Sequence, residues 1–149
     1  MKRLLLARRM LLLNSQTGES AAEENLITPV EFRVDSDGSV RLNKLVGYAT
    51  QDIASGTVCR ITGNISCVGE NTSTGYGNIY FRGAYGPFSS KQIFRRIISP
   101  SITYEYNDEF DMELTAAKDI VTGEGIINID IGKLLVGYVQ VTNMKLVKV

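Results

Sequence analysis

The chain has no histidine and no tryptophan, and only two cysteines and three prolines among its 149 residues. Histidine is the side chain whose ordinary pKa lies nearest neutrality, and it is the commonest transition-metal ligand in proteins. Its absence excludes Ser-His-Asp and Cys-His catalytic sites and histidine-ligated zinc. No other residue set for catalysis replaces them, so we expect a protein that is not an enzyme, with no catalytic residues, no metal site and no cofactor.

An excess of charge of either sign is also absent, because 16 basic residues balance 16 acidic ones. Such a balance gives no overall field that would attract a polyanion. Nor does the sequence contain the run of about 18 apolar residues that a membrane-spanning helix needs. We therefore expect neither nucleic acid nor a membrane among the partners.

Leucine is concentrated at the N-terminus, where residues 2–8 and 9–15 form two heptads with a basic first residue and leucines at the third, fourth and fifth positions. This repeat predicts a short amphipathic helix, although Arg8 falls within its broad leucine face. Two heptads are too short for a stable isolated helix, so contact with a partner or a second copy is expected to order it. The apolar residues of this predicted assembly helix are Leu4, Leu5, Leu6, Met10, Leu11, Leu12 and Leu13.

A secretory signal is an alternative interpretation of this segment, since a basic start followed by leucines is typical of one. Arg8 and Arg9 interrupt the apolar run, however, and no small-x-small cleavage pattern follows. A second alternative is that the segment packs against its own β-domain. The polar, acidic residues 14–25 have the composition of an exposed linker. We therefore divide the chain into an N-terminal helical arm and linker (1–25) and a β-sandwich domain (26–149).

From residue 26 onward the sequence predicts strands. Residues 30–34 and 39–42 alternate in polarity on either side of Asp35-Ser36-Asp37-Gly38, which predicts a hairpin with a turn at Gly38. The same turn begins like a calcium-binding loop, but later ligand positions carry Arg41 and Asn43. A plain turn is therefore favoured over a calcium site.

Other segments complete a set of seven or eight predicted strands. The pattern of residues 91–98 indicates a second short helix. The closing residues 139–149 alternate with period two, which places the C-terminal segment within a sheet. Further predicted strands cover residues 57–68, 78–82, 101–106, 110–114 and 125–131. Short strands at this spacing imply a sandwich.

Cys59 and Cys67 share one face of the predicted strand 57–68, about 27 Å apart if the strand is uninterrupted. This distance favours two buried free thiols, whereas a tight turn at Gly63 would allow a disulfide. Glu109, Asp111 and Glu113 share the face of a strand opposite the apolar residues. A solvated outer face is favoured there over a cation site or an acid pair for glycoside cleavage.

The aromatic-rich region 75–88 places Tyr76 and Tyr85 among glycines. Glycine-rich surroundings indicate exposed rings, which suit stacking on sugars or contact with a protein. Tyr76 and Tyr85 are thus the candidate ligand or partner residues. Tyr80 or Phe81 is expected in the core by alternation.

The order of these segments resembles the jelly-roll domains of carbohydrate-binding-module type. The likeness covers about residues 30–149 and rests on the segment 55–66, the Tyr80-Phe81 strand, the late strand 125–131 and the ending Asn-Met-Lys-Leu at 143–146. Glycan-binding members of that family usually place tryptophan in their cleft, and this chain has none. Similar domains recur on bacteriophage fibres and capsid decorations, and a short N-terminal arm before a small β-domain looks like such a virion protein.

The expected fold is therefore mainly β, a jelly-roll-like antiparallel β-sandwich with a short N-terminal amphipathic helix. The resemblance implies a structural component of a virus particle, such as a phage capsid decoration, head fibre or tail fibre, assembled in the host cytoplasm. Its expected partners are copies of itself, with a trimer favoured, and other virion proteins. Two alternatives are a glycan-binding module that uses Tyr76 and Tyr85, and a secreted bacterial surface β-domain.

Overall fold

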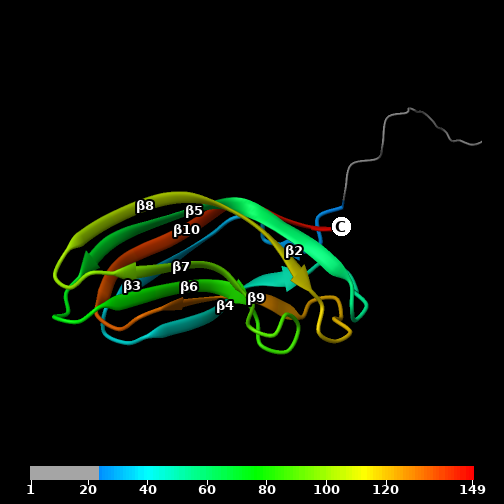
Figure 1. Cartoon of the computed structure of the whole chain (residues 1–149), viewed down its shortest axis with the longest axis horizontal. Coiled ribbons are helices and arrows are strands. Elements are labelled where there is room, and N and C mark those ends of the chain that lie inside the picture. The colour runs from blue at the N-terminus through cyan, green and yellow to red at the C-terminus, as the bar shows by residue number, and fades with distance from the viewer. Residues whose placement is uncertain (1–23) are drawn as a thin grey trace, which may run out of the picture.

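The computed structural model describes residues 24–149, which form two antiparallel β-sheets packed face to face (Figure 1). One sheet has four strands in the order β3-β10-β5-β8, and the other has five in the order β2-β4-β9-β6-β7. The strands are β2 (Ile27–Thr28), β3 (Phe32–Asp37), β4 (Leu42–Ala49), β5 (Val58–Asn71), β6 (Gly77–Gly83), β7 (Gln92–Ile98), β8 (Thr103–Thr115), β9 (Gly125–Ile131) and β10 (Leu135–Lys148). Residues 24–149 contain no helix, and so none that is long and apolar enough to cross a membrane.

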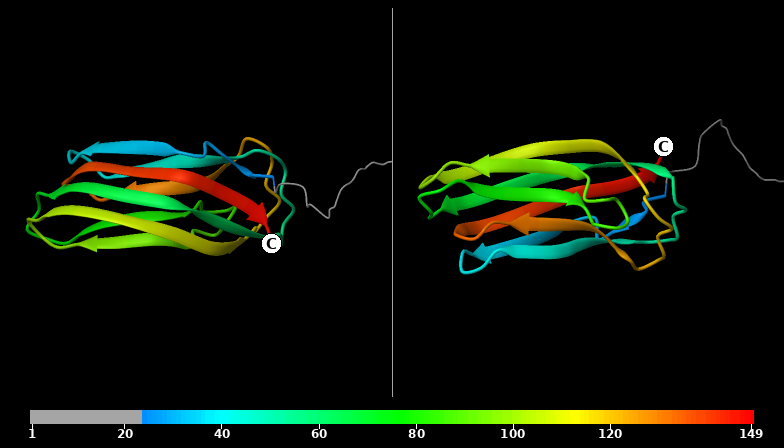
Figure 2. Two further views of the ribbon diagram at one scale, coloured as in Figure 1. Left: turned by 90° about the horizontal axis from the view of Figure 1, so that it is seen from above. Right: turned by 60° about the horizontal axis from the view of Figure 1, so that its bottom comes forward.

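The strands pair in a nested way, in which β3 pairs with β10, β4 with β9, β5 with β8, and β6 with β7. The chain can thus be drawn as one long hairpin that closes at β6 and β7 and is rolled so that β10 also pairs with β5 and β9 with β6. Two views show this order across each sheet (Figure 2). The connectivity is that of a jelly roll. The predicted β-sandwich is therefore confirmed, whereas the predicted N-terminal helix and its seven apolar residues lie outside the described part of the chain.

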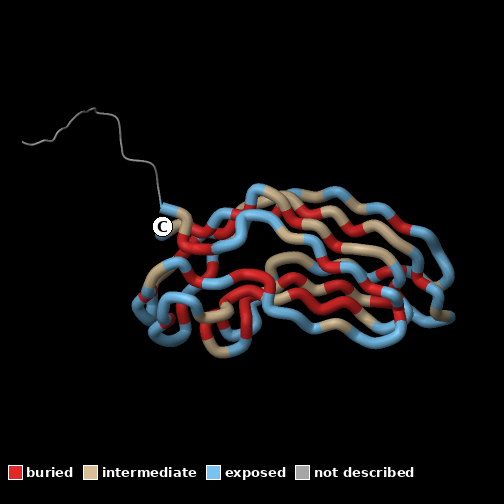
Figure 3. The backbone as a smooth tube through the Cα atoms, turned by 180° about the vertical axis from the view of Figure 1, so that it is seen from behind, coloured by how far each residue is buried: buried red, intermediate tan, exposed pale blue. Residues whose placement is uncertain are grey.

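The core follows from period-two alternation on the long strands. Along β5, Cys59, Ile61, Ile65 and Cys67 are each at most 1% exposed, as predicted from their shared face. Buried and less buried positions alternate along the strands of both sheets (Figure 3). Each large apolar side chain buried in this way contributes about 1.5–3 kcal/mol to folding. Phe81, one of the two aromatic residues expected in the core, is fully buried there.

The predicted hairpin between residues 30–34 and 39–42 is wrong. The two strands exist as β3 and β4, but β3 pairs with β10 in one sheet and β4 with β9 in the other. Gly38 does have the positive φ of a turn, at +82°. A turn determines only that the chain reverses. The partner of each strand depends on distant segments, which here divide the two strands between the sheets.

The predicted helix at residues 91–98 is also wrong, because this segment is strand β7 at the edge of the five-stranded sheet. Its pairing with β6 places Phe94 opposite Phe81 and Arg95 opposite Tyr80. Ile93, Ile97 and Ile98 favour extended backbone when a partner strand is present. Tertiary pairing therefore overrides the helical spacing of the apolar residues.

The two short strands predicted at 101–106 and 110–114 are one continuous strand, β8, paired along its whole length with β5. Strand β5 likewise runs through Gly63 without a turn. A Cβ atom at Gly63 would lie 2.5 Å from the Phe110 ring, so this glycine makes room for the aromatic side chain. The alternative of a hairpin at Gly63 is thus excluded.

Candidate functional site

The loops of the sandwich gather at two opposite ends of the molecule (Figure 1). We call one the proximal end, because the described chain enters there at Glu24 and its last residue, Val149, lies beside it. The proximal loops are 50–57, 84–91 and 116–124. We call the other the distal end, and its loops are 38–41, 72–76, 99–102 and 132–134.

Tyr76 and Tyr85 are both exposed, as predicted, with 70% and 90% of their surface accessible. They do not lie together. Tyr76 precedes β6 at the distal end, and Tyr85 follows β6 at the proximal end. A seven-residue strand spans about 20 Å. The two rings therefore cannot stack on one small sugar, and each belongs to a different surface.

A chain of backbone hydrogen bonds joins the four distal loops. Leu134 N–H donates to Gly38 C=O over 3.1 Å, and Thr72 N–H donates to Leu134 C=O over 3.0 Å. Ser101 N–H donates to Ser73 C=O, also over 3.0 Å. Each loop is thereby fixed to a neighbour, which lowers the freedom of the whole end.

Asn71 supports the same end from within and is fully buried at the end of β5. Its Nδ2 group lies 3.0 Å from the carbonyl oxygens of Gly75 and Ser99, and its Oδ1 atom accepts the N–H of Ser73 at 2.9 Å. One side chain thus satisfies backbone groups of two loops. The loop that carries Tyr76 is therefore tied to the end of β5 and to the neighbouring loop 99–102.

Apolar side chains are exposed around this distal end. A groove of about 570 Å³ runs beside it between β3 and the start of β4, with Leu42 and Val136 among its lining residues. At its rim, the Arg33 guanidinium lies 3.8 Å from the centre of the Tyr138 ring. The exposed apolar residues at or next to the distal loops are Val40, Tyr76, Ile97, Ile102, Leu134 and Val136. Exposed apolar groups gathered in this way are typical of contact surfaces.

A second candidate surface, which the sequence-based reasoning missed, lies on the outer face of the five-stranded sheet. Asp130 on β9 is only 3% exposed and forms ion pairs with both Arg41 and Arg82. Arg82 also donates from Nε to Asn128 Oδ1 over 3.2 Å. The clue in the sequence was the pair of polar residues, Asn128 and Asp130, at alternate positions of an otherwise isoleucine-rich strand.

The Asp130 cluster continues across β6 to β7. The guanidinium groups of Arg82 and Arg95 lie 5.4 and 4.9 Å from the centre of the Tyr80 ring. Register places Asp130 opposite Tyr80, and Tyr80 opposite Arg95. Ion pairs and cation–π contacts therefore join side chains from neighbouring strands into one polar surface.

The acidic segment of β8 and the turn at Asp35-Ser36-Asp37-Gly38 are the two places where the sequence left a cation site as an alternative. Within residues 24–149, no group of three or more carboxylate or cysteine side chains is arranged to hold a metal ion. Asp37 instead accepts the N–H and the hydroxyl of Ser39, and these hydrogen bonds lower the pKa of its carboxyl group. Glu109, Asp111 and Glu113 are exposed on the outer face, as the alternation predicted.

Both cysteines are buried free thiols, in agreement with the favoured prediction. Burial raises the pKa of Cys67 to about 12 and also raises that of Cys59. Thiols that stay protonated near neutral pH are poor nucleophiles and poor metal ligands. They are part of the apolar core and of neither candidate surface.

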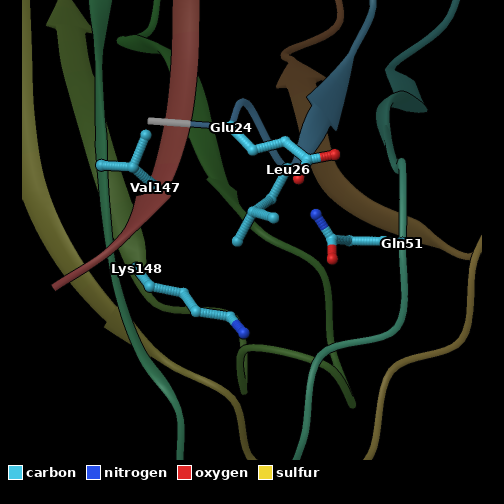
Figure 4. Close-up of a pocket in the computed structure, with 5 residues that line it drawn as sticks. All are labelled: Glu24, Leu26, Gln51, Val147 and Lys148. Carbon is cyan, nitrogen blue, oxygen red and sulfur yellow. The ribbon is translucent and has the colours of Figure 1, made fainter. Parts of the chain in front are cut away.

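A small pocket of about 240 Å³ opens at the proximal end and is lined by Glu24, Leu26, Gln51, Val147 and Lys148 (Figure 4). Asn25 fixes this corner by donating to Met144 C=O over 3.0 Å and accepting the Leu146 N–H over 2.9 Å. Glu24 thus lies next to the last strand, β10.

No family model matches the chain, and no curated protein matches it. Among solved structures, it is similar to the tripod from the baseplate of bacteriophage Tuc2009, with 16% identity and a TM-score of 0.47. That match covers 80% of this chain and 46% of the baseplate chain, so this chain spans less than half the length of that protein.

Two further structures are similar over most of this chain. The CBM36-1 domain of a xylanase from the hindgut metagenome of Trinervitermes trinervoides has 10% identity and a TM-score of 0.29, with 74% of this chain and 95% of that domain covered. The VP2 protein of infectious bursal disease virus has 14% identity and a TM-score of 0.28, with coverage of 79% and 29%. A phage baseplate protein, a viral VP2 protein and a carbohydrate-binding domain are thus among its structural neighbours.

Proposed function

We propose that this protein is a non-enzymatic structural component of a virus particle, of the kind that decorates a phage capsid or forms a head or tail fibre. Its N-terminal segment anchors it, and its jelly-roll domain is displayed on the particle. The observation that carries this proposal is the separation of the two ends. The described chain enters at the proximal end, and the hydrogen-bonded loops lie at the distal end.

The construction of the distal end suits display. A loop held by backbone hydrogen bonds and by the buried Asn71 amide keeps its shape when it is fully exposed on a particle. Most of the exposed apolar groups near this end lie in loops or at strand ends, where they leave the sandwich core intact. Contact with another molecule at the distal end therefore requires no change in the sheets.

The anchoring function falls to the leucine columns of residues 2–15, which lie outside the described residues. Leucines repeated over two heptads suit contact with other helices, and this proposal includes self-association, with a trimer favoured. The virion is the proposed location. The other virion proteins are the proposed partners at the proximal end.

The test replaces Leu5 and Leu12 with Asp in the full chain. It then measures whether the chain co-purifies with particles of the virus that encodes it. We expect the wild-type chain in purified particles and the variant in the unbound fraction, with unchanged far-UV circular dichroism. The matched control replaces Gln16 and Thr17 with Asp, which adds the same charge to the polar linker. Absence of the wild-type chain from particles, or retention of the leucine variant, would contradict the proposal.

Glycan binding is the second candidate function, and the exposure of Tyr76 on a fixed loop favours it. A ring that is 70% exposed and held by its loop loses little freedom when it stacks on a sugar. Because Tyr85 lies at the other end of β6, this candidate now depends on Tyr76 at the distal end.

A further inference from the structure

The outer faces of the two sheets carry opposite charge. On the four-stranded sheet, the outward row of β8 has four carboxylates and no basic residue. Asp111 is paired with Arg60, whose Nε donates over 2.7 Å. The other three carboxylates are exposed and have no ion-pair or hydrogen-bond partner among residues 24–149; they are Glu105, Glu109 and Glu113. We call these four carboxylates the acidic row.

The outer face of the five-stranded sheet is basic. Arg41 and Arg82 are ion-paired with a single carboxylate, that of Asp130, and Arg95 lies beside Tyr80 on the far side of β6. Asp130 is buried, whereas the Arg41 side chain is 60% exposed and Arg95 is also exposed. This face therefore presents net positive charge to solvent. We call it the basic face, and it extends over the neighbouring strands β9, β6 and β7.

The basic face is also built as a contact surface. Arginine and tyrosine, together with tryptophan, are enriched among the side chains that dominate the binding energy of protein interfaces. Here Asp130 fixes Arg82, and Tyr80 lies between Arg82 and Arg95. Side chains that are already held in place lose less freedom when a partner binds.

We propose that the basic face of one copy binds the acidic row of a second copy. Both halves of this contact are present on every chain, and the chain as a whole is neutral, so a second copy supplies the complementary charge. The contact joins two different surfaces. Repetition of such a contact gives a closed ring if the rotation closes, and an open filament if it does not. The inference concerns the β-domain and is separate from the anchoring assigned to the N-terminal leucines.

The experiment compares full-length chains by sedimentation velocity in about 0.05 M and about 0.5 M salt, since surface charge contacts are screened over this range. One variant reverses the acidic row with Glu105→Lys, Glu109→Lys and Glu113→Lys. The other reverses the edge of the basic face with Gln92→Glu and Arg95→Glu, which leaves Asp130 and its two partners intact. A control, Thr74→Glu with Lys133→Glu, makes the same change in net charge as the basic-face variant but places it at the distal loops. Circular dichroism checks that each chain folds.

We expect the wild-type chain and the control to associate in low salt and to dissociate at least about tenfold more readily in high salt. Each reversed variant alone should lose the salt-sensitive part of its association, because like charges then face each other, whereas association through the N-terminal leucines is unaffected. An equal mixture of the two reversed variants should associate again, because each basic surface of one variant then meets an acidic surface of the other. Restoration in the mixture is not expected from a merely unfolded variant.

Three outcomes would overturn the proposal. One is a wild-type chain that stays monomeric in low salt. Another is salt-sensitive association that persists undiminished in both reversed variants, which would assign it to charges outside these two surfaces. The third is a basic face that binds heparin, used as an anionic probe, while the chain does not self-associate. Because the measurement uses purified protein alone, it is independent of whether the chain is found on virus particles.

Discussion

The two sheets of the sandwich reach their stability in different ways. Three of the four strands in one sheet are 13 or 14 residues long, whereas β6, β7 and β9 of the other have seven residues each. The long strands hold their register through many consecutive pairs. The short strands are joined in addition by the side-chain cluster around Asp130.

An arginine–aspartate ion pair contributes differently to stability in each sheet. Arg60 and Asp111 are both more than half exposed on the four-stranded sheet. On the five-stranded sheet, the Asp130 side chain is only 5% exposed between its two arginines. Water screens the first pair and is largely excluded from the second carboxylate. Burial, more than the type of contact, therefore decides what a polar residue contributes here.

The largest expected effect concerns the backbone of the four-stranded sheet, which contains the three long strands. Gly137 on β10 faces Gly69 on β5, and a Cβ atom at Gly137 would lie 2.0 Å from the Val68 carbonyl oxygen. Its φ of +149° is also unfavourable for other residues. We expect Gly137→Ala to cost more than about 3 kcal/mol of unfolding free energy in urea denaturation. Gly123→Ala is the control, because its φ is +88° but no atom lies within 4 Å, and it should cost about 1 kcal/mol. Equal losses would show that the close strand approach is unimportant.

The second test compares the two ion-pair sites directly. Asp130→Asn removes the buried carboxylate that Arg41 and Arg82 share, and we expect a loss of about 1–2 kcal/mol, because water still reaches the two arginines left behind. Asp111→Asn removes the exposed partner of Arg60 and should change stability far less. Thermal denaturation of both variants measures the difference. A larger loss with Asp111→Asn would reverse the interpretation of the two sheets.

The third test concerns the pH dependence of stability that results from the buried thiol of Cys67 on the four-stranded sheet. Burial raises the pKa of Cys67 to about 12, above the value of an exposed thiol. The unfolded chain therefore releases this proton first as the pH rises, and the thiol's contribution to stability declines above the unfolded pKa. We expect a loss of about 1 kcal/mol between pH 8 and pH 10 in urea denaturation. Cys67→Ala should show a smaller decline, and an unchanged slope would contradict the burial of this thiol as its cause.

Both native thiols should also react slowly with a thiol reagent and rapidly after denaturation.

The smallest expected effect concerns the two tyrosines that flank β6. Tyr76→Ala and Tyr85→Ala remove exposed rings, so neither should lower the melting temperature appreciably. Under the glycan-binding alternative, Tyr76→Ala should weaken binding on a glycan array by about tenfold or more, and Tyr85→Ala should not. Under the virion proposal the array should stay blank. A glycan signal that requires both tyrosines would contradict their separation.

The sequence alone predicted those features that depend on neighbours within one strand. Alternation along residues 57–68 and 139–149 predicted their buried faces, and glycines around Tyr76 and Tyr85 predicted exposure. The predicted order of strands also gave the sandwich. These features are local, since successive side chains of a strand point to opposite faces whatever the partner strand is.

Tertiary structure decided which strands pair and which side chains meet. It placed β3 and β4 in different sheets, made residues 92–98 a strand, brought Arg41 to Asp130, and set Tyr76 and Tyr85 at opposite ends. Arg41 and Asp130 are 89 residues apart in the chain, so no local pattern could join them. Pairing between distant segments depends on the competition among all strands for the same core. That competition is resolved only when the whole domain folds.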